Sequence, residues 1–389
     1  MQVHQAGTGG TAMPRGKLKK VFPGGNTYMG FYSFYDFIIE PDATRIFVVK
    51  GGPGVGKSTF MRKIGEAMLE RGFDVEFHCC SSDNDSLDGV VIPKIRVAII
   101  DGTAPHIVDP KNPGAVDEII HLGDYWDEDK MRASKEQVLQ DNQRISRLYR
   151  IAYSALKEAK VIRDEWESYV AESMLWPRVY QAKAELLEAI FAGVRSRYNQ
   201  PARERHLFAT ALTPRGLVTG NLETLLQDVR RLYTVAGDPG SGVPGILATV
   251  ARVANEKGLY TEVYHCPFDP NNIDMVIIPE IQVAVMNWQP PHAIDLQDIP
   301  GLQVAMALDL NKFIDREHLK LYGNEIASAI VRYQAALDRA IAHIREAKIT
   351  HDHMESYYIP AMDFEAINIK REEILQRILG YAAEVLGQA

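Results

Sequence analysis

The feature that most constrains the fold of this chain is an internal repeat whose period is almost half of its 389 residues. The segment Arg45–Gly51 (RIFVVKG) matches Arg231–Gly237 (RLYTVAG) at an offset of 186 residues, and Val90–Pro93 matches Val276–Pro279 at the same offset. Two further matches have an offset of 188 residues: Glu158–Lys160 with Glu346–Lys348, and Glu167–Tyr169 with Glu355–Tyr357. Stacked-repeat proteins have periods of about 20 to 50 residues, so this repeat indicates a duplicated domain.

A duplication also fits the length, because 389 residues exceed the size at which a single hydrophobic core is usual. We predict a flexible N-terminal tail over residues 1–20, a first half over 21–200 and a second half over 201–389. The boundary is placed at Asn199-Gln200-Pro201, where a helical pattern stops at polar residues and a proline.

Each half shows the same order of expected elements. In the first half, a β-branched and aromatic run at 44–50 predicts a strand, and a helical pattern follows from about Lys57 to Arg71. Further apolar runs of strand length lie at 73–79 and 95–101, with a weaker candidate at 116–122. Continuous apolar strands that alternate with helices are typical of a parallel sheet covered on both faces. The predicted class is therefore α/β, with tandem duplicated domains that each contain a parallel sheet.

A pair of helices is expected at the end of each half. Apolar side chains recur at three- and four-residue spacing from about 131 to 170, which predicts a long amphipathic helix, and a second helix follows at about 178–197. The second half repeats the pair at about 322–357 and 362–386. Each α/β core thus carries an α-helical hairpin, for which three uses are open: a lid, a dimer arm or a brace between the halves.

The strongest motif is a loop with the pattern G-x-x-x-x-G-K-[ST] between a predicted strand and a predicted helix. It reads Gly51-Gly52-Pro53-Gly54-Val55-Gly56-Lys57-Ser58 and is followed by Thr59. The N–H groups of such a loop surround a phosphate, and the helix N-terminus adds partial positive charge. We expect Lys57 to reach the β- and γ-phosphates and the Ser58 hydroxyl to ligate Mg²⁺. The predicted ligand is Mg-ATP, and adenine is preferred by default because the first half has no guanine motif.

Acidic residues beside the loop are candidates for its chemistry. Asp101 ends the apolar run 95–100 in the manner of a Walker B carboxylate, which orients Mg²⁺. Gly102 follows where many ATPases place a catalytic glutamate, so hydrolysis requires another group to position water. The segment 81–88 (SSDNDSLD) follows a predicted strand on the side of the sheet where α/β folds bind ligands. A turn made of Asx and Ser side chains explains that segment equally well.

The second half provides an internal control for these assignments. Its loop, Gly237–Pro244, keeps the glycines but loses the side chains that contact phosphate and metal. The replacements are Lys57 by Val243, Ser58 by Pro244 and Asp101 by Asn287. We infer that the second half keeps the architecture and no longer performs Mg-nucleotide chemistry, while the N–H groups of its loop still suit an anion.

The same comparison sorts the acidic residues of 81–88. Two of them have acidic counterparts in the degenerate half, which favours structural roles: Asp83 with Asp269, and Asp88 with Asp274. Asp85 corresponds to Asn271, so Asp85 joins Lys57 and Asp101 as a catalytic candidate.

Two other groups have both a functional and a structural interpretation. The run His351-Asp352-His353 with Glu355 has metal-ligating residue types, but Arg163 stands in place of His351 in the first half. A solvated helix face is therefore expected there. The aromatic segment Phe31–Tyr35 precedes the loop and suits stacking on adenine, although docking against the sheet is the commoner use of such residues.

Composition limits the partners. The net charge of -8 argues against broad binding to nucleic acid or anionic lipid, and no apolar run approaches the ~20 residues of a bilayer span. The three cysteines include no C-x-x-C pair, as expected for a reducing cytoplasm. The expected partner is a nucleoside triphosphate, and the helical hairpins are the expected surfaces for a protein partner or a small-molecule acceptor.

Several segments together resemble a family of bacterial two-half P-loop proteins, whose members are usually called predicted ATPases or nucleotide kinases. The resemblance covers about the whole chain and rests on Phe22-Pro23-Gly24-Gly25-Asn26-Thr27, Gly30-Phe31-Tyr32-Ser33-Phe34, the loop Lys50–Thr59, and His78-Cys79-Cys80-Ser81-Ser82-Asp83. It implies the P-loop NTPase fold and ATP binding but no particular substrate.

Three functions fit these features. The preferred one is an ATPase whose hydrolysis drives a rearrangement between the halves. The alternatives are a small-molecule or nucleotide kinase in which the hairpin closes as a lid, and a nucleotide-gated binding protein with little hydrolysis.

Overall fold

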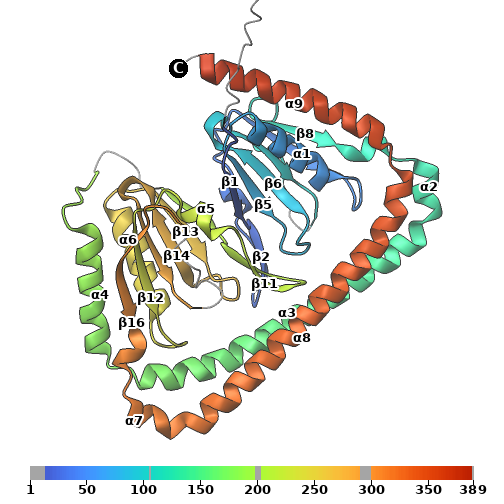
Figure 1. Ribbon diagram of the computed structural model, residues 1–389. Helices are drawn as coiled ribbons and strands as arrows, with labels where there is room; N and C mark the ends of the chain where they lie inside the picture. Colours follow the sequence, from blue (N-terminus) through green and yellow to red (C-terminus); the bar gives the residue numbers. More distant parts are fainter. Residues whose placement is uncertain (1–13, 105–106, 198–202, 290–298, 388–389) are drawn as a thin grey trace, which may run out of the picture.

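The computed structural model describes residues 14–104, 107–197, 203–289 and 299–387, which form two α/β bodies, each built on a six-stranded sheet (Figure 1). In spatial order, the first sheet consists of β1 (Leu18–Val21), β5 (Val75–Cys79), β6 (Leu87–Ile92), β7 (Val97–Asp101), β4 (Arg45–Lys50) and β8 (Asp117–His121). The second consists of β9 (Glu204–Leu207), β13 (Thr261–His265), β14 (Ile273–Ile278), β15 (Val283–Asn287), β12 (Arg231–Ala236) and β16 (Gln303–Asp309). The two orders correspond strand by strand, as expected for a duplicated architecture.

Each sheet is mixed, which corrects the expectation of wholly parallel sheets. Strand β4 pairs in parallel with β7 and β8, whereas β6 runs antiparallel to both β5 and β7. Strand β14 runs antiparallel to its two neighbours in the same way. The cause is the connection length, because only residues 80–86 join β5 to β6, and a parallel crossover needs about a dozen residues or more.

Strand β1 begins inside the segment that was expected to be a flexible tail. Leu18 to Val21 pair in parallel with Val75 to His78 of β5, so the prediction of a tail over residues 1–20 is wrong from Leu18 onward. Residues 1–13 of that tail and the predicted boundary Asn199-Gln200-Pro201 lie outside the described residues.

Both faces of each sheet are covered, as the continuous apolar strands predict. One face of the first sheet packs against α1 (Lys57–Glu70) and α9 (Phe364–Gly387), and the equivalent face of the second sheet packs against α6 (Val243–Glu256) and α4 (Trp176–Phe191). Residues 38–43 and α5 (Leu222–Leu226) contribute to the cores on the opposite faces of the first and second sheets, respectively.

The helices at the end of each sequence half pack on the other body. From the first sheet, α2 (Glu128–Ala133) and α3 (Lys135–Glu172) lead to α4, which contributes Leu186 and Ile190 to the core of the second body. From the second sheet, α7 (Arg316–Leu319) and α8 (Gly323–Tyr358) lead back to α9, which contributes Ile374 and Ile378 to the core of the first body (Figure 1). The packed bodies therefore differ from the sequence domains 21–200 and 201–389.

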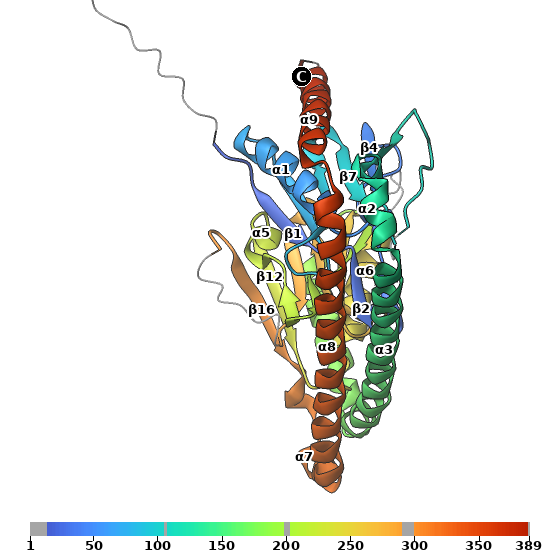
Figure 2. The same cartoon turned by 90° about the vertical axis from the view of Figure 1, so that its right-hand side faces the viewer.

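Helices α3 and α8 form an antiparallel pair that connects the bodies (Figure 2). Their seam is rich in buried alanine, including Ala152, Ala155, Ala336 and Ala340, so the two backbones approach closely. Ion pairs flank the seam and fix the antiparallel register: Arg144 with Glu346 at 2.8 Å, Arg339 with Glu158, and Arg332 with Glu165 at 2.7 Å. The prediction of a helical hairpin within each half is therefore wrong, because α3 pairs with α8 of the other half while α4 and α9 pack on the sheets. The α3–α8 pair is a brace between the bodies.

A pseudo-twofold axis passes between the two edge strands β1 and β9. Phe22 and Phe208, which are repeat counterparts, each donate a backbone hydrogen bond of 2.9 Å to the other. The hairpins β2–β3 (Gly24–Thr27 and Gly30–Ser33) and β10–β11 (Thr210–Thr213 and Gly216–Thr219) also meet near this axis, where the Asn26 side chain donates to the Leu212 carbonyl at 3.0 Å.

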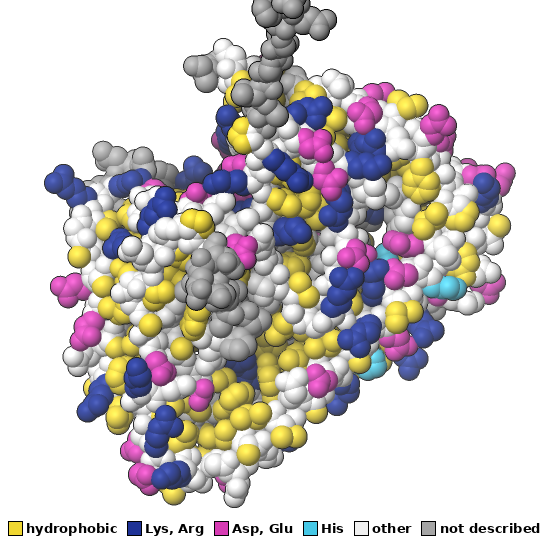
Figure 3. Space-filling model, viewed as in Figure 1, with side chains coloured by type: hydrophobic (Ala, Val, Ile, Leu, Met, Phe, Trp, Pro, Cys, Tyr) yellow, Lys and Arg dark blue, Asp and Glu magenta, His cyan; other side chains and the backbone are white. Residues whose placement is uncertain are grey.

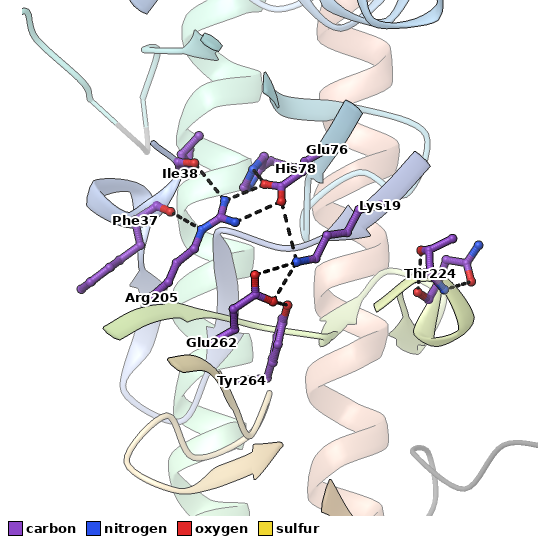
Figure 4. A network of polar contacts seen from close by, with 10 residues as sticks. Lys19, Phe37, Ile38, Glu76, His78, Arg205, Thr224, Glu262 and Tyr264 are labelled. Carbon is purple, nitrogen blue, oxygen red and sulfur yellow. Dashed lines mark hydrogen bonds and ion pairs between the residues drawn. The ribbon is translucent and has the colours of Figure 1, made fainter. Parts of the chain in front are cut away.

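Four charged side chains surround the same axis and form a network (Figure 4). Lys19 Nζ lies 2.8 Å from Glu262 and 3.7 Å from Glu76, and Arg205 donates to Glu76 at 2.7 Å. Arg205 is the repeat counterpart of Lys19, and Glu262 is that of Glu76. Burial alone raises the pKa of Glu76, but Arg205 and Lys19 overcome this effect and hold that pKa well below its usual range.

On the face shown in Figure 3, Lys and Arg side chains are interspersed with Asp and Glu side chains. Among the described helices, none combines the length and the apolar character that a membrane span requires. The three cysteines are free thiols.

Candidate functional site

The glycine-rich loop lies where the sequence places it, between the end of β4 at Lys50 and the start of α1 at Lys57. Gly54 and Gly56 have φ angles of 67° and 86°, a left-handed conformation that disfavours side chains with a Cβ atom. Gly56 caps α1, so the loop turns directly into the positive end of a helix dipole. This arrangement presents backbone N–H groups at the carboxyl edge of the sheet.

Lys57 folds back over the loop. Its Nζ donates to the carbonyls of Gly51 at 3.0 Å and Gly52 at 2.8 Å, and it lies 3.7 Å from Asp101 Oδ2. Asp101 is the last residue of β7, and its other oxygen accepts a hydrogen bond from the Thr103 N–H at 2.9 Å. The structure thus brings Lys57 and Asp101 together, as the sequence predicts.

Ser58 connects the loop to β6. Its hydroxyl oxygen accepts a hydrogen bond from the backbone N–H of Leu87 at 3.0 Å. Because Leu87 is the first residue of β6, the start of that strand lies beside the start of α1. Asp88 is the next residue along the strand.

Asp88 is a site residue that the sequence reasoning missed. The antiparallel register pairs Gly89 with Ile100, so Asp88 lies opposite Asp101 at the end of the ladder. Asp88 is buried, and burial together with the negative charges of Asp101 and Asp83 raises its pKa to about 7, despite hydrogen bonds from Tyr35 and Cys80. Burial also raises the pKa of Asp101, an effect that Lys57 opposes.

The second body has an asparagine in place of one of these two carboxyl groups. Asn287 replaces Asp101, and its Nδ2 donates to Asp274 Oδ1 at 3.1 Å. The degenerate half therefore has a hydrogen-bonded amide–carboxyl pair where the first half has two carboxyl groups. The sequence comparison gave Asp88 a structural role because its counterpart Asp274 is also acidic. The informative difference is in the residue opposite, which is Asp101 in the first half and Asn287 in the second. The pairing could not be predicted because β6 was not among the expected strands.

Asp85 lies at an interface between the halves. Its carboxylate pairs with Arg215, in the turn of the β10–β11 hairpin, at 2.6 Å, and both side chains are largely exposed. The counterpart Asn271 donates to the Tyr28 hydroxyl at 3.2 Å, in the turn of the β2–β3 hairpin. Position 85 thus contacts the hairpin of the opposite half, and the Asp85 carboxylate points to that hairpin rather than to the glycine-rich loop. The catalytic role of Asp85 stays a prediction.

Helices of the sequence's second half cover the loop of the first. Glu355 on α8 accepts a hydrogen bond from the Gly54 N–H through Oε1 at 3.2 Å. The Tyr358 ring packs so closely on Gly52 that an added Cβ would lie 2.6 Å from it, and the Phe364 ring lies beside Gly56. These contacts cross some 300 positions of sequence, and no motif near the loop predicts them.

The neighbourhood of Glu355 differs from the solvated helix face that was expected. His351 is partly buried, its Nδ1 lies 3.6 Å from Glu355 Oε1, and burial lowers its pKa although Glu355 opposes this. His351, Asp352 and Glu355 place potential ligand atoms within 4.8 Å of one another. However, Asp352 is paired with Lys348, which also contacts Asp83 at 3.2 Å, and Glu355 is bound to the loop. His353 pairs with Asp141 on α3.

The aromatic segment before the loop docks inside the protein. Phe34 is buried against Phe208 at a ring-centroid distance of 5.0 Å, near the pseudo-twofold axis. Tyr32 and Phe37 pack on Phe34 in turn. These contacts agree with the structural interpretation of Phe31–Tyr35.

Comparison of the chain with protein-family models, with curated proteins and with solved structures found no match. The fold and the site together define a two-body α/β protein in which one of two glycine-rich strand-to-helix loops keeps its lysine, its serine and a nearby aspartate.

Proposed function

We propose that this protein is a P-loop NTPase that binds Mg-ATP at one competent site, formed by the first-half loop Gly51–Ser58, and hydrolyses it. The observation that carries the proposal is the contrast between the two loops. The first has Lys57 beside Asp101 at 3.7 Å, whereas Val243 and Asn287 stand at these positions in the second. The resemblance to two-half P-loop proteins supports the same fold family.

The loop residues have direct roles in this proposal. The N–H groups of Gly52 and of residues 54–59, at the start of α1, bind the β- and γ-phosphates. Lys57, which now donates to two loop carbonyls, transfers these hydrogen bonds to phosphate oxygens. A bound phosphate is a stronger acceptor than a neutral carbonyl because it is charged.

The carboxyl groups fit a divalent cation. Asp88, which is buried, and Asp101, which is partly buried, form an acidic pair beside the Ser58 hydroxyl. Oxygen ligands are those that Mg²⁺ prefers. When bound, Mg²⁺ would neutralise charge on the phosphates and on this pair. Ser58 and Asp101 are the proposed ligands, and Asp88 is placed to accept a hydrogen bond from a water in the same shell.

Asp88 is also the better candidate for orienting the attacking water. Gly102 carries no carboxylate, and the carboxylate of Asp85 is engaged by Arg215. Asp88 lies opposite Asp101, and a carboxyl group is a common general base. Asp85 is kept as the second candidate.

The kinase alternative requires arginines on a lid. Two arginines of α3 are engaged within the brace: Arg144 pairs with Glu346, and Arg163 pairs with Glu167 at 2.8 Å. These pairs favour hydrolysis over transfer to an acceptor. A nucleotide-gated binding protein with slow turnover is the other alternative, and a protein partner for it would contact α3 and α8.

The test is to incubate the purified full chain with Mg-ATP, alone and with pools of nucleosides and metabolites, and to follow ADP and phosphorylated products. We expect ATP-dependent ADP release without an acceptor. We also expect Lys57→Ala to lower ATP affinity by about 10- to 100-fold, because it removes a charged hydrogen-bond donor from the phosphates.

Lys94→Ala is the matched control, because Lys94 is exposed at the opposite end of β6, away from Asp88 and the loop. Its affinity should equal that of the parent. Unchanged ATP binding in Lys57→Ala would remove the site assignment. Phosphorylated acceptors would replace the ATPase assignment by the kinase one.

A further inference from the structure

The N–H of Gly54 already has an anionic partner that comes from the other sequence half. Glu355 Oε1 accepts its hydrogen bond at 3.2 Å. Glu355 lies near the C-terminus of α8, one turn before Tyr358, and both side chains face the loop. In a loop of this type, the corresponding N–H is one of those that cradle a phosphate.

The repeat counterpart of Glu355 is bound differently. Glu167 Oε1 accepts a hydrogen bond from Arg163 Nε at 2.8 Å, four residues earlier on its own helix. The backbone of Glu167 packs against Gly240 of the degenerate loop. The second loop therefore has a helix packed on it but holds no carboxylate through this residue.

The difference follows from one substitution. His351 occupies the place of Arg163, and burial lowers the pKa of His351, so it is neutral at pH 7. A neutral imidazole competes for a carboxylate much less strongly than a guanidinium, which forms charge-assisted hydrogen bonds. Glu355 is consequently available to the loop, whereas Glu167 is not.

A phosphate and the Glu355 carboxylate are both anions that use the same donor. Their repulsion at contact distance and the close packing of Tyr358 on Gly52 make the two states exclusive. Nucleotide binding must therefore move at least the Glu355 side chain and the ring beside it.

We propose that Glu355 is a resident competitor for the phosphate-binding loop, so that the triphosphate binds only by displacing the end of α8. The inference rests on the proposed function, since it concerns the regulation of the same site. Glu355, a residue of the second sequence half, thus lowers the nucleotide affinity of the loop in the first half.

The displaced segment is anchored at defined points. The Asp127 N–H donates to the Ala361 carbonyl and the Asp363 N–H to the Tyr125 carbonyl, both at 2.8 Å. Beyond them α9 lies in the core of the first body, while α8 runs back along α3 to the second. Moving the end of α8 at Glu355 would therefore also move residues 358–364 and the α3–α8 brace. Nucleotide binding would in this way affect the contact between the two bodies.

The first measurement is the affinity of the full chain for Mg-ATP by calorimetry, with Glu355→Gln and Glu355→Ala as variants. Both remove the charge, so we expect affinity to rise by about tenfold. Glu167→Gln is the matched control and should bind as the parent does. An unchanged or weaker affinity in both Glu355 variants, in a parent that binds ATP, would overturn the competitor role and leave the proposed function intact.

A second variant keeps Glu355 and changes its neighbour. His351→Arg copies Arg163 and is expected to draw the carboxylate away from Gly54, which also raises ATP affinity. If the arginine acts through Glu355, the double variant His351→Arg/Glu355→Gln binds no more tightly than Glu355→Gln alone. Additive gains would show that the arginine contacts ATP directly and would refute this route.

Hydrogen exchange provides a readout independent of affinity. In the parent, ATP is expected to increase amide exchange in residues 351–364, because binding releases this segment, and ADP should do so as well if its β-phosphate displaces Glu355. Protection of 351–364 by ATP would overturn the proposal. Absence of ATP binding in the parent and in every variant would instead sink the proposed function.

Discussion

At the scale of single residues, the most informative pair is Asp88 with Asp101. Burying two carboxyl groups together is unfavourable, and the rise of the Asp88 pKa to about 7 reflects burial first and the neighbouring charges second. The second body avoids this cost through the Asn287 to Asp274 hydrogen bond. The proposed binding of a cation would explain why the first body has two acidic residues here despite their cost to stability.

This pair leads to a prediction about Asp101→Asn, which copies the second body. The amide should donate to Asp88, so the free energy of unfolding without Mg²⁺ should rise by about 1–3 kcal/mol. Mg²⁺-dependent ATP hydrolysis should be lost. Urea denaturation in chelator at pH 5 and pH 8 measures the first effect, and ADP release measures the second.

The sign of the pH effect follows from the raised pKa. The parent loses stability as the pH rises from the unfolded value near 3.8 through about 7, because the folded state binds the Asp88 proton more tightly. The gain in Asp101→Asn should therefore be larger at pH 8 than at pH 5. Asn287→Asp, the reverse change in the second body, should destabilise. A gain that is equal at both pH values would contradict the explanation.

At the scale of elements, the α3 and α8 pair depends on small side chains. Both helices bury alanines on facing sides, and a larger side chain there must separate the backbones or shift the register. The exposed ion pairs along the seam contribute little individually, because water and salt screen them. Packing of the buried apolar side chains in the seam is therefore expected to be the main source of stability in the brace.

Ala340→Leu tests this view, since Ala340 is fully buried in the seam. We expect a loss of about 1–3 kcal/mol in the free energy of unfolding, measured with urea. Ala335→Leu is the matched control, because Ala335 is exposed on the same helix and should change stability by less than about 0.5 kcal/mol. Equal effects from the two variants would show that the seam is not close-packed.

At the scale of the whole molecule, two bodies share one chain through exchanged helices and a pseudo-twofold interface. The network of Lys19, Glu76, Arg205 and Glu262 lies at the axis and is nearly buried, with each acid contacted by a base from the other half. Removing one member of such a network leaves an uncompensated buried charge. The interface charges should therefore contribute strongly to the cohesion of the bodies.

Glu76→Gln is expected to lower the free energy of unfolding at pH 7 by about 3–5 kcal/mol. The pKa of Glu76 is depressed in the folded state, so its contribution is present above the unfolded pKa and is lost as the pH falls through the folded one. The parent and Glu76→Gln should converge in acid. Glu40→Gln, which removes an exposed partner of Arg203, is the control and should follow the parent at every pH.

The sequence by itself determined the duplication, the strand–loop–helix unit at Gly51–Ser58, the long helices and the loss of Lys57, Ser58 and Asp101 equivalents in the second half. These features depend on local pattern and on comparison of the chain with itself. The predicted helix at about 178–197 is too long at its C-terminal end, because α4 ends at Phe191. Gly193 follows with a φ of 73°, a left-handed conformation that is typical of helix ends.

Only the tertiary structure decided which helices cover which sheet, that β6 runs antiparallel, and that Asp88 and Glu355 adjoin the loop. Apolar periodicity specifies that one face of a helix is buried, but it does not specify which sheet covers that face. The apolar patterns of α4 and α9 are therefore compatible with packing on either sheet. The contact of Glu355 with Gly54 arises from this exchange of helices. It is a property of packing between distant segments, which no local pattern encodes.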